Sequence, residues 1–139
     1  PDGWIEDKLN SCLVLSCCYQ AMGENAAAFD ILFYSFTMDV PRAEICCEIG
    51  RLFMEKREYV TAAYWYQQAL LAPRKKKNGG FYIADSHDFI PAIQMCVCLD
   101  KAGRHREAFE FHKKARVLKP LHQAVIGNEK YFRDVWGME

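Results

Sequence analysis

The stretch that decides the fold is residues 43–73, AEICCEIGRLFMEKREYVTAAYWYQQALLAP. Its apolar residues recur every three or four positions, as on one face of an α-helix, on both sides of Arg57. Arg57 holds the place of a turn, and Pro73 ends the second segment because proline cannot continue the helical hydrogen-bond ladder. The stretch therefore predicts two helices that fold back on each other.

The same pattern of small and bulky residues occurs once before this stretch and once after it. Cys46 is matched by Cys12, 34 residues earlier, and by Ala92, 46 residues later. Small residues recur where two helices would cross closely, and bulky residues fill the volume between the crossings. The matched positions, copy by copy, are Cys12, Leu15-Ser16, Tyr19, Ala28 and Leu32; Cys46, Ile49-Gly50, Phe53, Ala62, Tyr66 and Ala69; and Ala92, Met95-Cys96, Leu99, Ala108, His112 and Ala115.

This spacing follows the tetratricopeptide (TPR) repeat, in which a first and a second helix form a pair and successive pairs stack into a solenoid. We therefore predict an all-α, TPR-like solenoid of about three repeats, near residues 9–42, 43–73 and 89–120. An insertion loop at 74–88 accounts for the longer second spacing, and residues 121–139 supply a capping helix. First helices are expected near 7–22, 42–56 and 89–102, second helices near 26–37, 59–72 and 105–118, and the capping helix near 121–136.

Length and composition indicate one ordinary globular domain. The chain has 139 residues, of which 51% are hydrophobic and 26% charged, as expected for a chain with a buried core. Its 18 basic and 18 acidic residues give zero formal net charge, which argues against nucleic acid as a partner because nonspecific binding needs clustered positive charge. No apolar run has the length of a membrane span, and no signal peptide opens the chain. Because it starts at Pro1 without an initiator methionine, we expect a piece of a larger protein.

The seven cysteines all fall on expected first helices. An odd count without an export signal favours reduced thiols and a cytoplasmic location. No Cys-x-x-Cys pair is present, and no histidine stands at zinc-ligand spacing beside the cysteines, so no metal site is predicted. Free cysteines on such helices are expected to act as small buried hydrophobes. A thiol-based sensor at an adjacent pair, Cys17-Cys18 or Cys46-Cys47, is the alternative.

The insertion is the part of the chain that least resembles a repeat. A basic tetrad, Arg74 to Lys77, is followed by Asn78-Gly79-Gly80, which is typical of a loop. It is either a solvated charge run or a flexible arm that binds anions. Phe81 and Tyr82 are expected to fold back and anchor the loop.

No catalytic constellation is evident. Asp85, His87 and Asp88 stand close together, but nothing near them in the sequence supplies a nucleophile or an oriented partner. His112 takes a bulky core position and is expected to be packed, whereas His105 and His122 flank that helix and are expected to face solvent.

Several short sequence segments, here called phrases, are characteristic of a known family when they are considered in their order along the chain. They are Pro41-Arg42-Ala43-Glu44, Ala63-Tyr64-Trp65-Tyr66-Gln67-Gln68-Ala69-Leu70, Gly80-Phe81, Phe89-Ile90-Pro91-Ala92-Ile93-Gln94-Met95-Cys96-Val97-Cys98, Lys119-Pro120 and Asn128-x-x-Tyr131-Phe132. Together they resemble the TPR-containing C-terminal region of family 2 glycosyltransferases of Firmicutes. The resemblance extends from about Leu13 to Phe132.

The resemblance implies a catalytic GT-A domain ahead of the repeats, which binds a nucleotide sugar and a divalent metal through an Asp-x-Asp motif. No two aspartates stand two apart in this chain, so no catalytic residue carries over, and neither cofactor is expected here. What the resemblance implies for this chain is a noncatalytic role: binding an acceptor polypeptide or glycan, contacting the catalytic domain, or mediating homo-oligomerisation. The alternative is a free-standing TPR adaptor that binds a peptide or protein and has no linked enzyme.

Candidate binding residues follow from the expected repeat. In a TPR array the first helices line the concave surface, and the register places on that surface Asn10, Cys17 and Gln20; Glu44, Cys47, Arg51 and Glu55; and Val97, Asp100 and Lys101. Spacings of seven and four put Glu44, Arg51 and Glu55 near one helical stripe. The stripe is either an ordinary solvated face with local ion pairs or a polar groove for the acceptor. If Glu44 faces a groove, Glu44→Ala should leave stability nearly unchanged.

Overall fold

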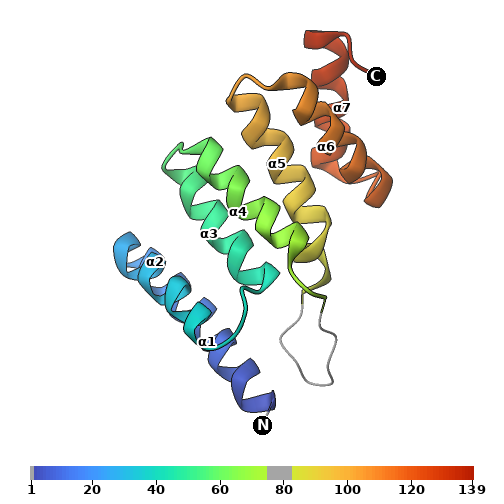
Figure 1. Cartoon of the computed structure of the whole chain (residues 1–139). Coiled ribbons are helices and arrows are strands. Elements are labelled where there is room, and N and C mark those ends of the chain that lie inside the picture. The colour runs from blue at the N-terminus through green and yellow to red at the C-terminus, as the bar shows by residue number, and fades with distance from the viewer. Residues whose placement is uncertain (1, 75–82) are drawn as a thin grey trace.

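The computed structural model of the chain describes residues 2–74 and 83–139 (Figure 1). All regular structure in these residues is helical, which confirms the prediction of an all-α chain. The elements are α1 (Asp2–Ala21), α2 (Asn25–Tyr34), α3 (Ala43–Glu55), α4 (Tyr59–Leu71), α5 (Phe89–Lys101), α6 (His105–Leu118) and α7 (Gln123–Trp136), with two short 3-10 turns, η1 (Ser35–Thr37) and η2 (Ala84–His87).

The helices lie close to their predicted positions, with three differences. Helix α1 begins at Asp2 rather than near residue 7. The segment expected to be helical over 26–37 leaves the α-helix after Tyr34 and continues as η1. There Ser35 Oγ donates a hydrogen bond to the Leu32 carbonyl at 2.6 Å, and such bonds from a hydroxyl back to a carbonyl compete with regular helix. The expected insertion loop contains η2 at its C-terminal end.

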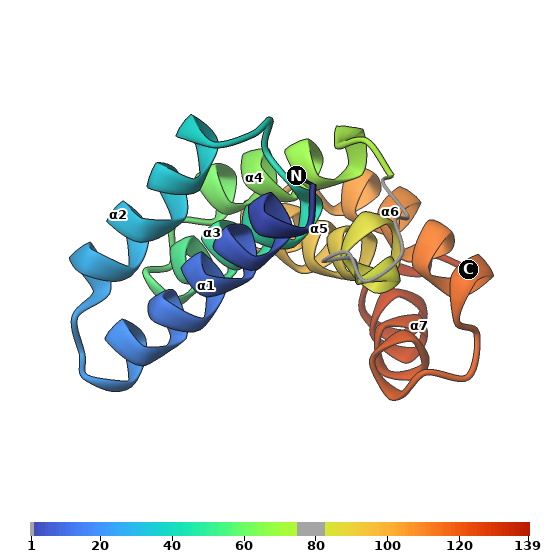
Figure 2. The same cartoon turned by 90° about the horizontal axis from the view of Figure 1, so that it is seen from below.

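Consecutive helices pack as three antiparallel pairs: α1 with α2, α3 with α4, and α5 with α6. Helix α2 contacts α3, α4 packs on α5, and α7 packs on α6. Figure 2 shows the helices as an arch, with α2, α4 and α6 along its outer curve and α1, α3 and α5 along its inner side. Helix α7 continues the inner side, so it lies beside α5 as well as over the end of the last pair.

The pairs are held by small residues at the points where helices cross. Ala28, Ala62 and Ala108 are completely buried at these crossings. A longer side chain at any of these positions would hold the two helices apart. The closest approach is at Gly50, where an added Cβ would lie 2.8 Å from Cε2 of the Tyr66 ring. Tyr66 itself is only 1% exposed, so its ring fills the space that the glycine leaves.

The turn inside each helix pair uses one residue with positive φ. Gly23 and Gly103 adopt φ of 76° and 84°, and Arg57 adopts 59° at the matching place in the second pair. Left-handed backbone is disfavoured for a residue with a Cβ and is readily accessible to glycine. Arg57 therefore keeps the turn in spite of its side chain, because the flanking helices fix the geometry.

The Gly50–Tyr66 contact gives a stability prediction. Gly50→Ala should lower the free energy of unfolding by about 1–3 kcal/mol, because the new methyl group must displace a buried aromatic ring in a packed core. Chemical denaturation of the two proteins, followed by circular dichroism, measures the change.

Gly127 supplies the matched control, since it lies inside α7 with nothing within 4 Å of the position that a Cβ would take. Gly127→Ala should raise stability by about 0.5–1 kcal/mol, because alanine restricts the unfolded chain more and favours helix. Equal effects of the two substitutions would contradict the steric role of Gly50.

Candidate functional site

Three of the predicted binding residues meet in one polar cluster on the inner side of the arch. Arg51 lies at its centre: its Nη1 is 3.1 Å from Glu55 Oε1, and its Nη2 donates to Gln20 Oε1, which comes from α1. Glu48 completes the cluster, accepting from Arg51 Nε at 3.4 Å and from Gln20 Nε2 at 3.1 Å. Sequence analysis missed Glu48, although its position one turn before Arg51 is the spacing of a helical ion pair.

The Arg51 guanidinium is already paired inside this polar cluster. Burial alone would raise the pKa of Glu48, but hydrogen bonds from Arg51 and Gln20 favour the carboxylate, and the pKa lies below its ordinary value. Arg51 therefore lies between the carboxylates of Glu48 and Glu55 and next to the Gln20 amide oxygen. These contacts join α1 to α3 and leave Arg51 little capacity to hold an anionic ligand.

Glu44 does not take part in this polar cluster, and its expected exposure in a groove is wrong. Its side chain is only 2% exposed, because the C-terminal end of the insertion folds over it. Glu44 Oε2 accepts a hydrogen bond from the backbone N–H of Ile83 at 2.6 Å and lies 3.5 Å from His87 Nε2. Glu44 thus anchors the start of η2 to α3.

Cys47 is covered by the same segment. Its thiol donates to the Ser86 carbonyl oxygen at 3.4 Å, and the residue is 8% exposed, so its expected place on an open groove is also wrong. The spacing of the first helices correctly placed Glu44 and Cys47 on the inner side of α3 but carried no information about η2. The accessible inner surface is consequently shifted toward the C-terminal halves of α3 and α5.

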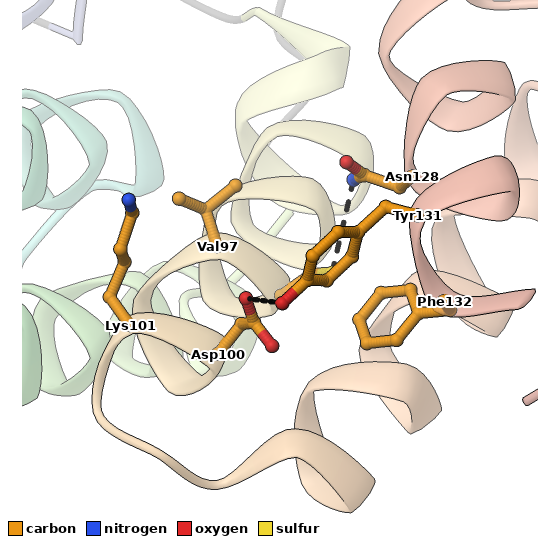
Figure 3. A pocket seen from close by; sticks show the side chains of 7 residues that line it. Val97, Asp100, Lys101, Asn128, Tyr131 and Phe132 are labelled. Carbon is orange, nitrogen blue, oxygen red and sulfur yellow. Dashed lines mark hydrogen bonds between the residues drawn. The ribbon is translucent and has the colours of Figure 1, made fainter. Parts of the chain in front are cut away.

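The third group of predicted residues lines a pocket between α5 and α7 (Figure 3). Its volume is about 280 Å³, and its walls are formed by Cys96, Val97, Asp100, Lys101, Asn128, Tyr131 and Phe132. Phe132 and Cys96 are buried and give an apolar floor. Asp100, Lys101 and Asn128 supply polar groups at the rim, so a ligand that is partly apolar and partly hydrogen-bonding fits this chemistry.

Asp100 is held in place by α6 and α7. Tyr131 Oη donates to Asp100 Oδ2 at 2.7 Å, and His105 Nδ1 lies 2.6 Å from Asp100 Oδ1. Trp136 donates through Nε1 to Tyr131 Oη at 3.0 Å and stacks on the His105 ring, with 3.9 Å between ring centroids. The carboxylate is therefore oriented before any ligand arrives. His105 is partly covered by this stacking rather than facing solvent as expected.

The pKa of Tyr131 reflects these competing contacts. The hydrogen bond from Trp136 favours the phenolate, but burial and the neighbouring Asp100 carboxylate outweigh it, and the pKa is raised. The phenol therefore remains protonated near neutral pH and keeps donating to Asp100.

Helix α7 is fixed to α6 by a second polar contact behind the pocket. His112 is completely buried, as predicted for a packed histidine, and its Nε2 lies 2.5 Å from Glu129 Oε2. Arg116 Nη1 also donates to Glu129 Oε1 at 2.7 Å. The contacts from His112 and Arg116 hold the pKa of Glu129 below its ordinary value. These bonds keep α7 where it can form one wall of the pocket.

The remaining predicted residues lie apart from the pocket. Asn10 and Cys17 are exposed on α1, at the other end of the arch from α7. Asp85 and Asp88 pair with different partners, Lys119 at 2.6 Å and Arg74 at 3.0 Å, so the cluster seen in the sequence is divided between separate contacts. The expected anchoring by Phe81 and Tyr82 falls outside the described residues, as do the lysines of the basic run.

The cysteines divide into two groups. Five are buried, as expected, and burial raises the pKa of Cys46, Cys96 and Cys98 to about 12, which keeps these thiols protonated and unreactive. Cys17 and Cys18 are exposed instead. Within residues 2–74 and 83–139, no three histidine, cysteine or acidic side chains gather closely enough to hold a metal ion.

Neither the protein-family models nor the curated proteins contain a match to this sequence. In the part of the chain that the structure describes, no helix is long and apolar enough to cross a membrane.

Because Glu44 is buried, its replacement by alanine should affect stability, contrary to the expectation from the sequence. Glu44→Ala should lower the free energy of unfolding by about 1–3 kcal/mol, because it removes a buried carboxylate and the hydrogen bond that this carboxylate accepts from the Ile83 N–H. Thermal and chemical denaturation measure the loss, and hydrogen exchange should show faster exchange at Ile83.

Glu55 is the matched control on the same helix, since its side chain is 53% exposed. Glu55→Ala should change stability by less than about 0.5 kcal/mol, as is usual for an exposed ion pair. If both alanine substitutions had the same small effect, the anchoring role of Glu44 would be excluded.

Proposed function

We propose that this chain is a noncatalytic TPR interaction domain that holds a polypeptide or glycan on the inner side of its arch. The observation that carries the proposal is the pocket between α5 and α7, which is lined by three of the residues predicted from the repeat pattern, Val97, Asp100 and Lys101. The packing of consecutive helix pairs, with small residues at their crossings, supports the TPR assignment.

The chemistry of the pocket suits a neutral or mixed ligand. Asp100 offers acceptor oxygens, whereas Lys101 and Asn128 offer donors, and Val97 and Phe132 supply apolar contact. Because Asp100 is already oriented by Tyr131 and His105, little conformational freedom is lost when a ligand binds to it. Peptide main chain and sugar hydroxyl groups both provide a donor and an acceptor close together, as this rim requires.

The polar cluster around Arg51 contributes differently. Its charges are paired internally through Glu48 and Glu55, so it does not provide a basic clamp for an acidic peptide terminus. We assign it to the support of the inner surface between α1 and α3, with ligand contact concentrated at the pocket.

Binding can be tested with an array of extended peptides and an array of oligosaccharides, probed with the purified chain. Ligands found there should bind at least about tenfold more weakly to Lys101→Ala, because a hydrogen bond to a charged group contributes about 1.5–3 kcal/mol. They should bind about two- to tenfold more weakly to Asn128→Ala, because a hydrogen bond between neutral groups contributes about 0.5–1.5 kcal/mol. Lys114→Ala is the matched control, since Lys114 is exposed on α6 with its ammonium 4.6 Å from the centroid of the Phe111 ring. The proposal fails if neither array binds, or if all three variants bind alike.

We further propose that the domain serves a bacterial family 2 glycosyltransferase. The support is the ordered set of phrases that resembles this family. Five of the seven residues that line the pocket fall in two of those phrases: Cys96 and Val97 in the first, and Asn128, Tyr131 and Phe132 in the second. Part of the resemblance thus falls on the proposed binding surface.

The link to the enzyme is tested on the native polypeptide, captured from its source cells with an antibody against this chain. We expect a polypeptide large enough to carry a further domain of about 100–200 residues, which releases nucleoside diphosphate from a panel of nucleotide sugars and requires a divalent metal. A native polypeptide of only 16.1 kDa, or one that leaves every donor intact, would leave the free-standing adaptor as the function. This outcome is independent of the array result.

A further inference from the structure

The end of the arch formed by α1 and α2 carries an open apolar groove. Its volume is about 450 Å³, and both helices contribute to its walls, α1 through Trp4 and Leu15 and α2 through Ile31 and Tyr34. Trp4 is 59% exposed, Tyr34 56% and Leu15 43%. Large apolar side chains gathered in one exposed hollow are typical of a surface that another chain segment covers.

The later helix pairs indicate what covers such a surface. In α1 the outward stripe is Ser11, Leu15 and Cys18, and all three residues are exposed. A shift of 34 residues places Ile45, Ile49 and Leu52 at the same positions of α3, and a further 46 residues places Pro91, Met95 and Cys98 at those of α5; all six are buried.

The second helix of the preceding pair buries the stripe in both later pairs. Ala28 and Leu32 of α2 form one core with Ile45, Ile49 and Leu52. Helix α4 covers α5 in the same way, and Ala62 and Tyr66 share a core with Met95 and Cys98. The groove on α1 and α2 is therefore the continuation of two interfaces that already exist in this chain, with its second helix missing.

We propose that this groove is the docking site for the second helix of a further helix pair, carried by the same polypeptide ahead of α1. The side chains of the α1 stripe match those of α5 more closely than those of α3: Leu15 corresponds to Met95, and Cys18 to Cys98. The occupant is therefore a helix of the α4 kind, which presents alanine-sized residues and one aromatic ring. The side-chain ridge of a helix can fill this groove. A second copy of the chain that packed its own groove against this one would leave both grooves unfilled.

The test adds such a helix to the complete chain. A second copy of residues 25–71 is joined ahead of residue 1 through a flexible Gly/Ser connection, so that α4 of the copy can reach α1 while its own α2 still covers α3. Docking is measured by the rate at which a thiol reagent labels Cys18, which lies on the stripe. In the Cys17→Ser background, with alanine in place of both cysteines of the added copy, Cys18 is the one exposed thiol among the described cysteines.

Cys18 labelling should be at least about tenfold slower in the extended chain than in the original, which corresponds to docking favoured by at least about 1.4 kcal/mol. Labelling of Cys17, measured in the Cys18→Ser background, should be unchanged, because Cys17 corresponds to Arg51 on the inner side. Leu15→Asp should restore fast labelling of Cys18. Val14→Asp should not restore it, since Val14 is 54% exposed and does not line the groove.

Two outcomes would overturn the proposal. In the first, Cys18 reacts equally fast with and without the added copy, including the case in which the copy stays unfolded beside an open groove. In the second, the original chain sediments as a dimer and Leu15→Asp makes it monomeric, which would assign the groove to a second copy of the chain. Neither result bears on the pocket between α5 and α7.

Discussion

The architecture depends on how closely two helices can approach where their side chains cross. At Gly50 a Cβ would lie within 3.0 Å of three atoms of the Tyr66 ring, so the absence of a side chain on α3 permits α4 to pack at this distance. The alanines at Ala62 and Ala108 meet the same requirement. Once each pair is closed, an apolar stripe on its first helix is still uncovered, and the second helix of the preceding pair must pack on it. The arch and its exposed end both follow from this constraint.

Polar contacts then decide how much of the inner side remains accessible. Glu44 and Cys47 contact Ile83 and Ser86 and are buried by them, so residues 83–87 occupy the N-terminal part of the inner surface. The polar cluster of Arg51 joins α1 to α3, and its guanidinium is already paired with Glu48 and Glu55. The part of the inner side that remains accessible and still offers polar groups to a ligand is the region of α5 that faces α7.

Helix α7 has a larger role than closing the last pair. His112 and Arg116 fix it through Glu129, and it then presents Asn128 and Tyr131 to α5. Tyr131 orients Asp100, and Trp136 in turn supports Tyr131 through the bond to its hydroxyl. The proposed binding pocket therefore depends on a helix that its sequence position alone describes as a cap.

The sequence by itself determined the helices and their pairing, because the periodicity of apolar residues and the spacing of Gly50, Ala62 and Tyr66 are local properties of the chain. It also placed Asp100, Lys101 and Arg51 on the inner side. Tertiary structure alone decided that Glu44 is buried, that Cys18 is exposed and that α7 meets Asp100. These outcomes depend on which distant segment covers each helix face, and a periodic pattern does not contain that information.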